Sequence, residues 1–177
     1  QICTFTNRKR HAMKILNERQ IEQKITRLAI EILENNLEED TLILAGINSK
    51  GMGFARLLHG QIRRMSDKKM ELTQIRINPA APLSEPVRIG LPVESLQDQT
   101  IILTDDVANT GRTLFYACRP LLDTLPRRLE VAVLIDRQHK LFPIRVDYVG
   151  LSLATTLKEN IEVVLNGSGE EAAVYLD

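Results

Sequence analysis

The run Ile101-Ile-Leu-Thr-Asp-Asp-Val-Ala-Asn-Thr-Gly-Arg-Thr113 holds the most informative pattern in this 177-residue chain. The apolar stretch from Thr100 to Thr104, which overlaps the start of this run, is too short for a helix and indicates a buried strand. Two acidic residues, Asp105 and Asp106, follow the strand and precede a glycine-containing turn of small residues. An amphipathic stretch from Arg112 to about Leu125 then predicts a helix that ends at a proline. A strand, a tight turn and a helix in this order are typical of an α/β domain.

Strands and helices alternate on both sides of this run. Asn17 and Gln20 predict a helix start, because their side chains can cap each other's backbone, and apolar residues then recur at helical spacing through Leu33. A second helix is predicted at 54–63, after a glycine-bearing loop at 48–53. Strands are predicted at 41–46, 72–77, 87–91, 100–104, 130–135, 148–153, 161–165 and 172–175, with a proline-rich loop at 78–86 and a turn at 166–169.

This alternation predicts an α/β fold with an open, mainly parallel sheet and helices on both faces. We expect a single domain over residues 1–177 that begins with a polar extension at 1–13, and the 44% apolar content suffices for one core. The longest apolar run is far too short to cross a membrane, and two cysteines make no disulfide framework, so the expected setting is the cytoplasm. The 23 basic and 23 acidic residues cancel, which argues against a strong non-specific nucleic-acid binder.

Polar loops follow three of the predicted strands, at 48–53, 104–113 and 136–140. Ligands of open α/β sheets bind at the carboxyl ends of the strands, so these loops are expected to meet around one site. The second loop offers backbone N–H groups and threonine hydroxyls to a phosphate. Asp105 and Asp106 would repel a phosphate, so their expected partners are sugar hydroxyls or a cation. The whole pattern predicts a ribose-phosphate site, although the acid pair alone is equally consistent with two solvated acids at a strand end.

Several segments of the chain, taken in order, resemble type I phosphoribosyltransferases. They are most similar to the bifunctional pyrimidine-operon attenuator and uracil phosphoribosyltransferase proteins. The resemblance covers nearly the whole chain and is carried by the 101–113 run together with 25–32, 45–51, 133–139 and 143–150. It implies a Mg²⁺-dependent enzyme that transfers phosphoribose from phosphoribosyl pyrophosphate to a base, with uracil favoured, and releases pyrophosphate. It also implies that Mg²⁺ is held mainly by the substrate and by water, without a direct protein ligand.

The resemblance assigns catalytic and phosphate-binding roles. It implies that Asp105, Asp106 and Arg137 are the catalytic residues, with the acid pair on the ribose hydroxyls. The segment that matches the 5′-phosphate loop consists of Val107, Ala108, Asn109, Thr110, Gly111, Arg112 and Thr113. Purine-specific relatives carry an acid where this chain has Asn109. An amide cannot exchange a proton with a purine ring, so this position favours a pyrimidine acceptor.

Two further segments are matched to the pyrophosphate group and to the base. Ser49, Lys50 and Gly51 resemble the pyrophosphate loop, where backbone amides and a cation would meet the leaving group as it gains charge. Tyr148 and Val149 resemble the segment that stacks on and borders the base.

The resemblance also implies partners and an alternative function. A homodimer or higher homo-oligomer is implied, and so is an RNA-binding face. The attenuator proteins carry a histidine where this chain has Ile30 and a basic residue where it has Leu151, so the RNA assignment is weakened. The loop at 77–84 is shorter than the family's acidic loop and lacks a carboxylate. The alternative to the enzyme is a nucleotide-sensing regulatory protein that binds pyrimidine-operon RNA with little or no catalysis.

Overall fold

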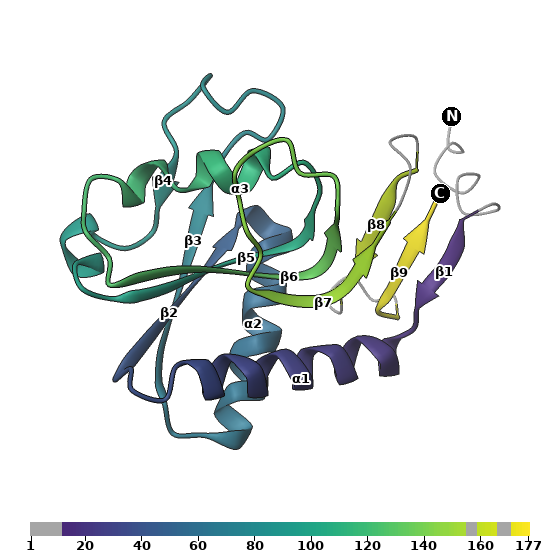
Figure 1. Cartoon of the computed structure of the whole chain (residues 1–177), viewed down its shortest axis with the longest axis horizontal. Coiled ribbons are helices and arrows are strands. Elements are labelled where there is room, and N and C mark those ends of the chain that lie inside the picture. Colours follow the sequence, from purple (N-terminus) through teal and green to yellow (C-terminus); the bar gives the residue numbers. More distant parts are fainter. Residues whose placement is uncertain (1–11, 155–158, 166–170) are drawn as a thin grey trace, which may run out of the picture.

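A six-stranded sheet with the strand order β4-β3-β2-β5-β6-β7 forms the centre of the molecule. The structure is a computed structural model that describes residues 12–154, 159–165 and 171–177. All neighbouring strands run parallel except β4, which pairs with β3 in the antiparallel direction. The strands are β2 (Thr41–Ile47), β3 (Lys69–Arg76), β4 (Arg88–Ile89), β5 (Thr100–Ala108), β6 (Arg128–Arg137) and β7 (Tyr148–Leu153). The predicted open, mainly parallel sheet is confirmed (Figure 1).

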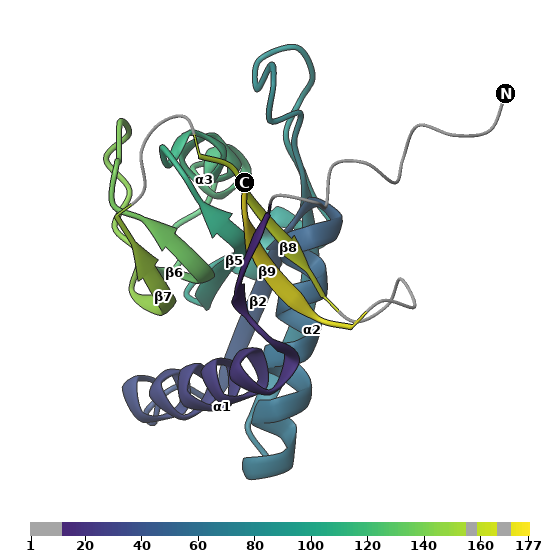
Figure 2. The same ribbon diagram turned by 90° about the vertical axis from the view of Figure 1, so that its right-hand side faces the viewer.

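Helices cover both faces of this sheet, as the sequence predicts (Figures 1 and 2). α1 (Glu18–Asn35) and α2 (Asn48–Met65) pack on one face, against side chains such as Leu42 and Leu44 of β2. α3 (Arg112–Ala117) packs on the other face, against the side chains that point the opposite way. Successive strand residues alternate between the two faces, so the uninterrupted apolar runs of the sequence supply both layers of the core.

The boundaries of two helices differ from the prediction. α2 begins at Asn48, so the expected loop at 48–53 forms the first turns of a helix, and the chain turns at Asn48 itself with φ +51°. Asparagine adopts this left-handed conformation more readily than most residues. α3 ends at Ala117, well before the expected Leu125. Pro120 is the cause, because proline has no N–H for the carbonyl four residues earlier and its ring clashes with that carbonyl.

A second sheet of three antiparallel strands has the order β1-β9-β8. β8 (Ile161–Val164) and β9 (Ala173–Leu176) correspond to predicted strands. β1 (Met13–Leu16) was not predicted, because it has only four residues and only Leu16 is buried. Leu16, Ile161 and Val163 of β8, and Val174 of β9 belong to the same apolar core as α1 and α2, so the small sheet continues the main core.

The other described segments are short. They include the 3₁₀ turns η2 (Val93–Leu96) and η3 (Arg119–Leu121), and the 78–86 loop, which projects beyond the sheet in both views (Figures 1 and 2). Within the described ranges, no helix combines the length and the apolar character that crossing a membrane requires. The predicted turn at 166–169 and residues 1–11 of the predicted extension lie outside the described residues.

Candidate functional site

The acid pair lies at the end of β5, on the carboxyl edge of the sheet. The Asp106 side chain is only 9% exposed, and its Oδ2 lies 3.5 Å from Nζ of Lys50. The backbone N–H of Asp106 donates to Oδ1 of Asp105 over 2.9 Å. Burial, and then the neighbouring Asp106 carboxylate, raise the pKa of Asp105 well above its usual value, while Lys50 acts in the opposite direction. Two carboxyl groups are therefore crowded at one strand end, beside the Lys50 ammonium group.

The first turn of α2 is held directly against this strand end. The Thr104 hydroxyl donates to the carbonyl oxygen of Gly51 over 3.1 Å. A Cβ atom on Gly51 would lie 2.3 Å from the Thr104 carbonyl oxygen, so only glycine permits this approach. The structure thus brings the residues predicted to meet pyrophosphate beside the acid pair, although on a helix rather than in a loop.

Asn48 fixes this junction and was not assigned a role from the sequence. Its side-chain amide pairs with the backbone of Ile77 as a neighbouring strand would. Nδ2 donates to the Ile77 carbonyl and Oδ1 accepts from the Ile77 N–H, both over 3.0 Å. The end of β3 is thereby tied to the start of α2. The sequence did offer a signal for a sharp turn here: an asparagine that follows a buried strand and shortly precedes Lys50-Gly51. Asparagine is enriched at positive φ.

The predicted 5′-phosphate loop begins in β5 and ends in α3. Val107 and Ala108 belong to the strand, and the chain then turns through Gly111, whose φ is +83°. The carbonyl oxygen of Thr110 accepts hydrogen bonds from the backbone N–H groups of Leu141 and Phe142, over 2.9 and 3.1 Å. The segment after β6 therefore packs against the turn and supports its shape.

Two cations, one at the end of β6 and one just after it, also contact the turn. Nη1 of Arg137 donates to Oδ1 of Asn109 over 3.2 Å, which places the third predicted catalytic residue beside the loop. Lys140 lies in the loop at 136–140 that was expected to join the site. Its ammonium group pairs with the Asp136 carboxylate and donates to the carbonyl oxygens of Arg137 (2.6 Å) and Ala108 (3.4 Å). We call residues 136–142 the β6 clasp.

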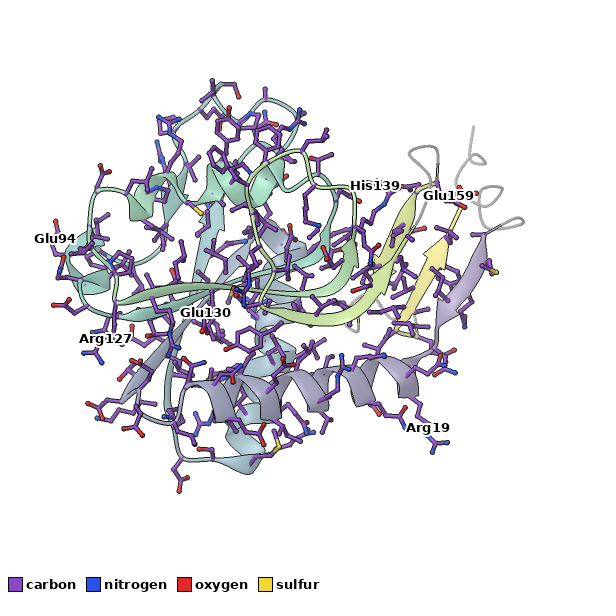
Figure 3. The ribbon with its side chains drawn as sticks, viewed as in Figure 1. Arg19, Glu94, Arg127, Glu130, His139 and Glu159 are labelled. Carbon is purple, nitrogen blue, oxygen red and sulfur yellow. The ribbon has the colours of Figure 1, made fainter. Side chains whose placement is uncertain are left out.

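Tyr148 does not lie with the other predicted site residues. It begins β7 and pairs with Ala132, so it occupies the amino end of the strand rather than the carboxyl end. Its side chain is 1% exposed, and its hydroxyl donates to Glu130 Oε2 over 2.8 Å and accepts from Asn36 Nδ2 over 3.0 Å. Figure 3 shows Glu130 between β6 and α1. This buried ring has no face for a base, and we do not include Tyr148 or its neighbour Val149 in the candidate site.

The donor atoms at this edge bear on the expected metal ion. In the part of the chain that the structure describes, no group of three or more His, Cys, Asp or Glu is placed to hold a metal. The available donors are the carboxylates of Asp105 and Asp106. Mg²⁺ is commonly held by one or two carboxylates together with substrate phosphates and several waters, so this donor set fits a substrate-borne Mg²⁺.

Comparisons of the sequence agree with this geometry. Residues 11–166 match a family model described as a phosphoribosyl transferase domain. The chain is 32% identical over 168 residues to the bifunctional protein PyrR of Macrococcus caseolyticus, with 92% of this chain and 97% of that protein covered. It is 34% identical over 174 residues to the bifunctional protein PyrR of Clostridium acetobutylicum, with 92% and 96% covered.

Solved structures share the fold at lower sequence identity. A hypoxanthine-guanine phosphoribosyltransferase from Bacillus anthracis matches with a TM-score of 0.66 at 17% identity, covering 79% of this chain and 81% of that one. The hypoxanthine phosphoribosyltransferase from Trypanosoma cruzi, in complex with the product IMP, matches with a TM-score of 0.68 at 22% identity, covering 80% and 81%. Because the family match and the alignments to the PyrR proteins both span most of the chain, this protein belongs to the type I phosphoribosyltransferase family.

Proposed function

We propose that this protein transfers phosphoribose from phosphoribosyl pyrophosphate to uracil and releases pyrophosphate. One observation carries the proposal: the acid pair, the first turn of α2 and the turn after β5 meet at one edge of the sheet. Each of these segments offers the chemistry that one part of the substrate needs.

In this proposal, the turn between β5 and α3 binds the 5′-phosphate. Backbone N–H groups of this turn and the hydroxyls of Thr110 and Thr113 are suitable donors to phosphate oxygens. Gly111, with φ +83°, adds no side chain to the turn. The β6 clasp supports the turn through its hydrogen bonds to the Thr110 carbonyl oxygen. A donor set that is already ordered costs less to organise when the phosphate arrives.

In this proposal, Asp105 and Asp106 bind the ribose. Carboxylates accept hydrogen bonds from the two ring hydroxyls, and their negative charge favours the positive charge that develops on the ribosyl centre as pyrophosphate leaves. Lys50, 3.5 Å from Asp106, is the cation beside the departing group. A substrate-borne Mg²⁺ would neutralise the charge of the pyrophosphate oxygens. The reaction then depends on placement and charge stabilisation, with no protein nucleophile.

Asn109 supports a pyrimidine acceptor. Its Oδ1 accepts a hydrogen bond from Arg137, so its amide is engaged in holding the catalytic arginine. An amide at this position also offers no proton exchange to a purine ring. Uracil needs no such exchange from this side chain, which makes it the favoured base.

A phosphoribosyl transfer assay tests the proposal. The purified protein is supplied with Mg²⁺, phosphoribosyl pyrophosphate and, separately, uracil, orotate, hypoxanthine, guanine and xanthine, and pyrophosphate release is followed. We expect release with uracil alone. The double variant Asp105→Asn with Asp106→Asn is expected to lose at least about 100-fold of that rate. Transfer to a purine would overturn the uracil assignment, and an unchanged rate in the double variant would overturn the site. Nucleotide binding without any transfer would favour the regulatory alternative.

A further inference from the structure

The 78–86 loop follows the carboxyl end of β3 and therefore stands at the same edge of the sheet as the proposed site (Figure 1). Hydrogen bonds within the loop give it a defined shape. Oδ1 of Asn78 accepts the backbone N–H groups of Ala80 and Ala81 over 3.1 and 3.2 Å. Nδ2 of the same side chain donates to the Ser84 hydroxyl over 3.3 Å, and the backbone N–H of Ser84 donates to the Ala81 carbonyl oxygen over 3.0 Å. This part of the loop is thus one small hydrogen-bonded unit.

One side chain from outside joins the loop to the proposed 5′-phosphate turn. Nη2 of Arg112, at the start of α3, donates to the Pro79 carbonyl oxygen over 2.9 Å. β2 lies between β3 and β5 in the sheet, so this hydrogen bond connects segments that follow two non-adjacent strands. It therefore holds the loop across the end of β2, toward the end of β5 where the acid pair lies.

The Arg112 side chain has no competing ion pair. Among residues 12–154, 159–165 and 171–177, no carboxylate lies within ion-pair distance of its guanidinium group. The resemblance places Arg112 in the 5′-phosphate segment, but its guanidinium group is directed to the loop. The turn can offer backbone N–H groups and threonine hydroxyls to a phosphate without this side chain. The position of the loop is therefore the feature that the Arg112 guanidinium group controls.

The loop presents apolar surface rather than charge. Between Asn78 and Ser84 its residues are Pro79, Ala80, Ala81, Pro82 and Leu83. Leu83 is 69% exposed. Apolar cover beside a reacting centre excludes water, which would otherwise compete with the base for the anomeric carbon.

We propose that Arg112 is a positioning residue, which holds the 78–84 loop against the transferase site and so keeps water from the ribosyl centre. This inference rests on the proposed function and extends it to a side chain that contacts the loop instead of the substrate. When the loop is displaced, water attacks the anomeric carbon in place of uracil. A C–O bond to water forms, the bond to pyrophosphate breaks, and ribose 5-phosphate, pyrophosphate and a proton are released. Loss of the Arg112 contact therefore favours hydrolysis over transfer.

The test compares the wild type with Arg112→Met, Arg112→Lys, Asn78→Ala and Arg119→Met. Methionine at 112 removes the donor and keeps an unbranched side chain, whereas lysine keeps a cationic donor. Asn78→Ala removes the hydrogen bonds that shape the loop and leaves the 5′-phosphate turn intact. Arg119→Met makes the same substitution at another exposed arginine and is the matched control.

Pyrophosphate release from phosphoribosyl pyrophosphate is measured with and without uracil. We expect Arg112→Met and Asn78→Ala to raise the rate without uracil by about 2–10-fold, the effect of losing one hydrogen bond. The double variant should add little to either single change, because both release the same loop. Arg112→Lys should return most of the way to the wild-type rate. Calorimetry with ribose 5-phosphate should give affinities within about twofold of the wild type, because the 5′-phosphate turn is unchanged.

Three results would overturn the proposal. They are an unchanged hydrolysis rate in Arg112→Met, an equal rise in Arg119→Met, and a loss of ribose 5-phosphate affinity in Arg112→Met. The last result would show that the guanidinium group binds the 5′-phosphate directly.

Amide hydrogen exchange separates this inference from the proposed function. Exchange at Ala80 and Ala81 is expected to be faster in Arg112→Met than in the wild type and unchanged in Arg119→Met. If the wild type neither transfers nor hydrolyses but exchange responds in this way, the proposed function fails and the loop-holding role of Arg112 stands. Unchanged exchange in Arg112→Met would overturn that role, whatever the activity of the wild type.

Discussion

Asp105 carries an electrostatic cost at neutral pH. Burial and the adjacent Asp106 carboxylate raise its pKa in the folded protein, whereas both carboxylates are solvated in the unfolded chain. A raised folded pKa means that the contribution of Asp105 to stability is most favourable at acidic pH and declines as the pH rises through that pKa. Ionised Asp105, the residue proposed to bind ribose, therefore lowers the stability of the folded protein at neutral pH.

This cost predicts that Asp105→Asn stabilises the protein while it disables transfer. We expect the variant to melt at a higher temperature than the wild type near neutral pH, because the amide is neutral. The advantage should shrink as the pH is lowered towards 3.8, the ordinary aspartate value. Melting temperatures measured at neutral pH and at about pH 5 provide the check. Asp123→Asn, the same substitution at an exposed position, is the control. A lower melting temperature for Asp105→Asn at neutral pH would contradict the argument.

At the scale of elements, the contact between α2 and β5 sets the distance between Lys50 and the acid pair. Alanine substitutions at two glycines of α2 distinguish the effect of this close contact on stability from the effect of helix propensity. Gly51→Ala is expected to destabilise the protein by about 1–3 kcal/mol, because the new methyl group would meet the Thr104 carbonyl oxygen. Gly60→Ala is expected to stabilise it by about 0.5–1 kcal/mol, because that position has open space around it. Denaturant unfolding measures both, and the same sign for the two variants would refute the contact.

Within the β6 clasp, Lys140 is expected to position the turn that we propose binds the 5′-phosphate. Lys140→Met removes the donor to the Ala108 and Arg137 carbonyls. We expect KM for phosphoribosyl pyrophosphate to rise about tenfold, with a smaller change in kcat, because the turn must be ordered by the substrate itself. Lys140→Arg keeps the charge and should recover most of the affinity. Steady-state kinetics decide the matter, and a loss confined to kcat would argue for a different role.

Several elements could be predicted from the sequence because local pattern and tertiary structure agree. The apolar run 100–104, the acid pair and the glycine turn are found together, since a buried strand must end in polar residues at the ligand edge. Other features depend on contacts distant in sequence. The length of α3 was overestimated because periodicity outweighed Pro120, and Tyr148 was assigned to the base although its hydroxyl is bonded to residues 18 and 112 positions away.

For the whole molecule, the small sheet and the main sheet share one core. Leu16 of β1 is 4% exposed and belongs to the apolar cluster of α1 and α2. Leu16→Ala is therefore expected to lower the free energy of unfolding by about 2–5 kcal/mol. Met13→Ala, on the same strand but 61% exposed, should change it by less than about 0.5 kcal/mol. Circular dichroism and loss of activity during denaturation should show one shared transition, and two separate transitions would show that the small sheet unfolds alone.

The buried bonds among Asn36, Glu130 and Tyr148 lie at the amino edge of the sheet, whereas every residue of the proposed site lies at the carboxyl edge. The buried polar bonds that support the fold and the residues proposed for catalysis thus lie at opposite edges of the sheet. Loops grafted onto the carboxyl edge from a relative with another acceptor base would leave the bonds at the amino edge unchanged. We therefore expect such chimaeras to change the preferred base without losing the fold, which makes this chain a suitable framework for engineering nucleotide synthesis.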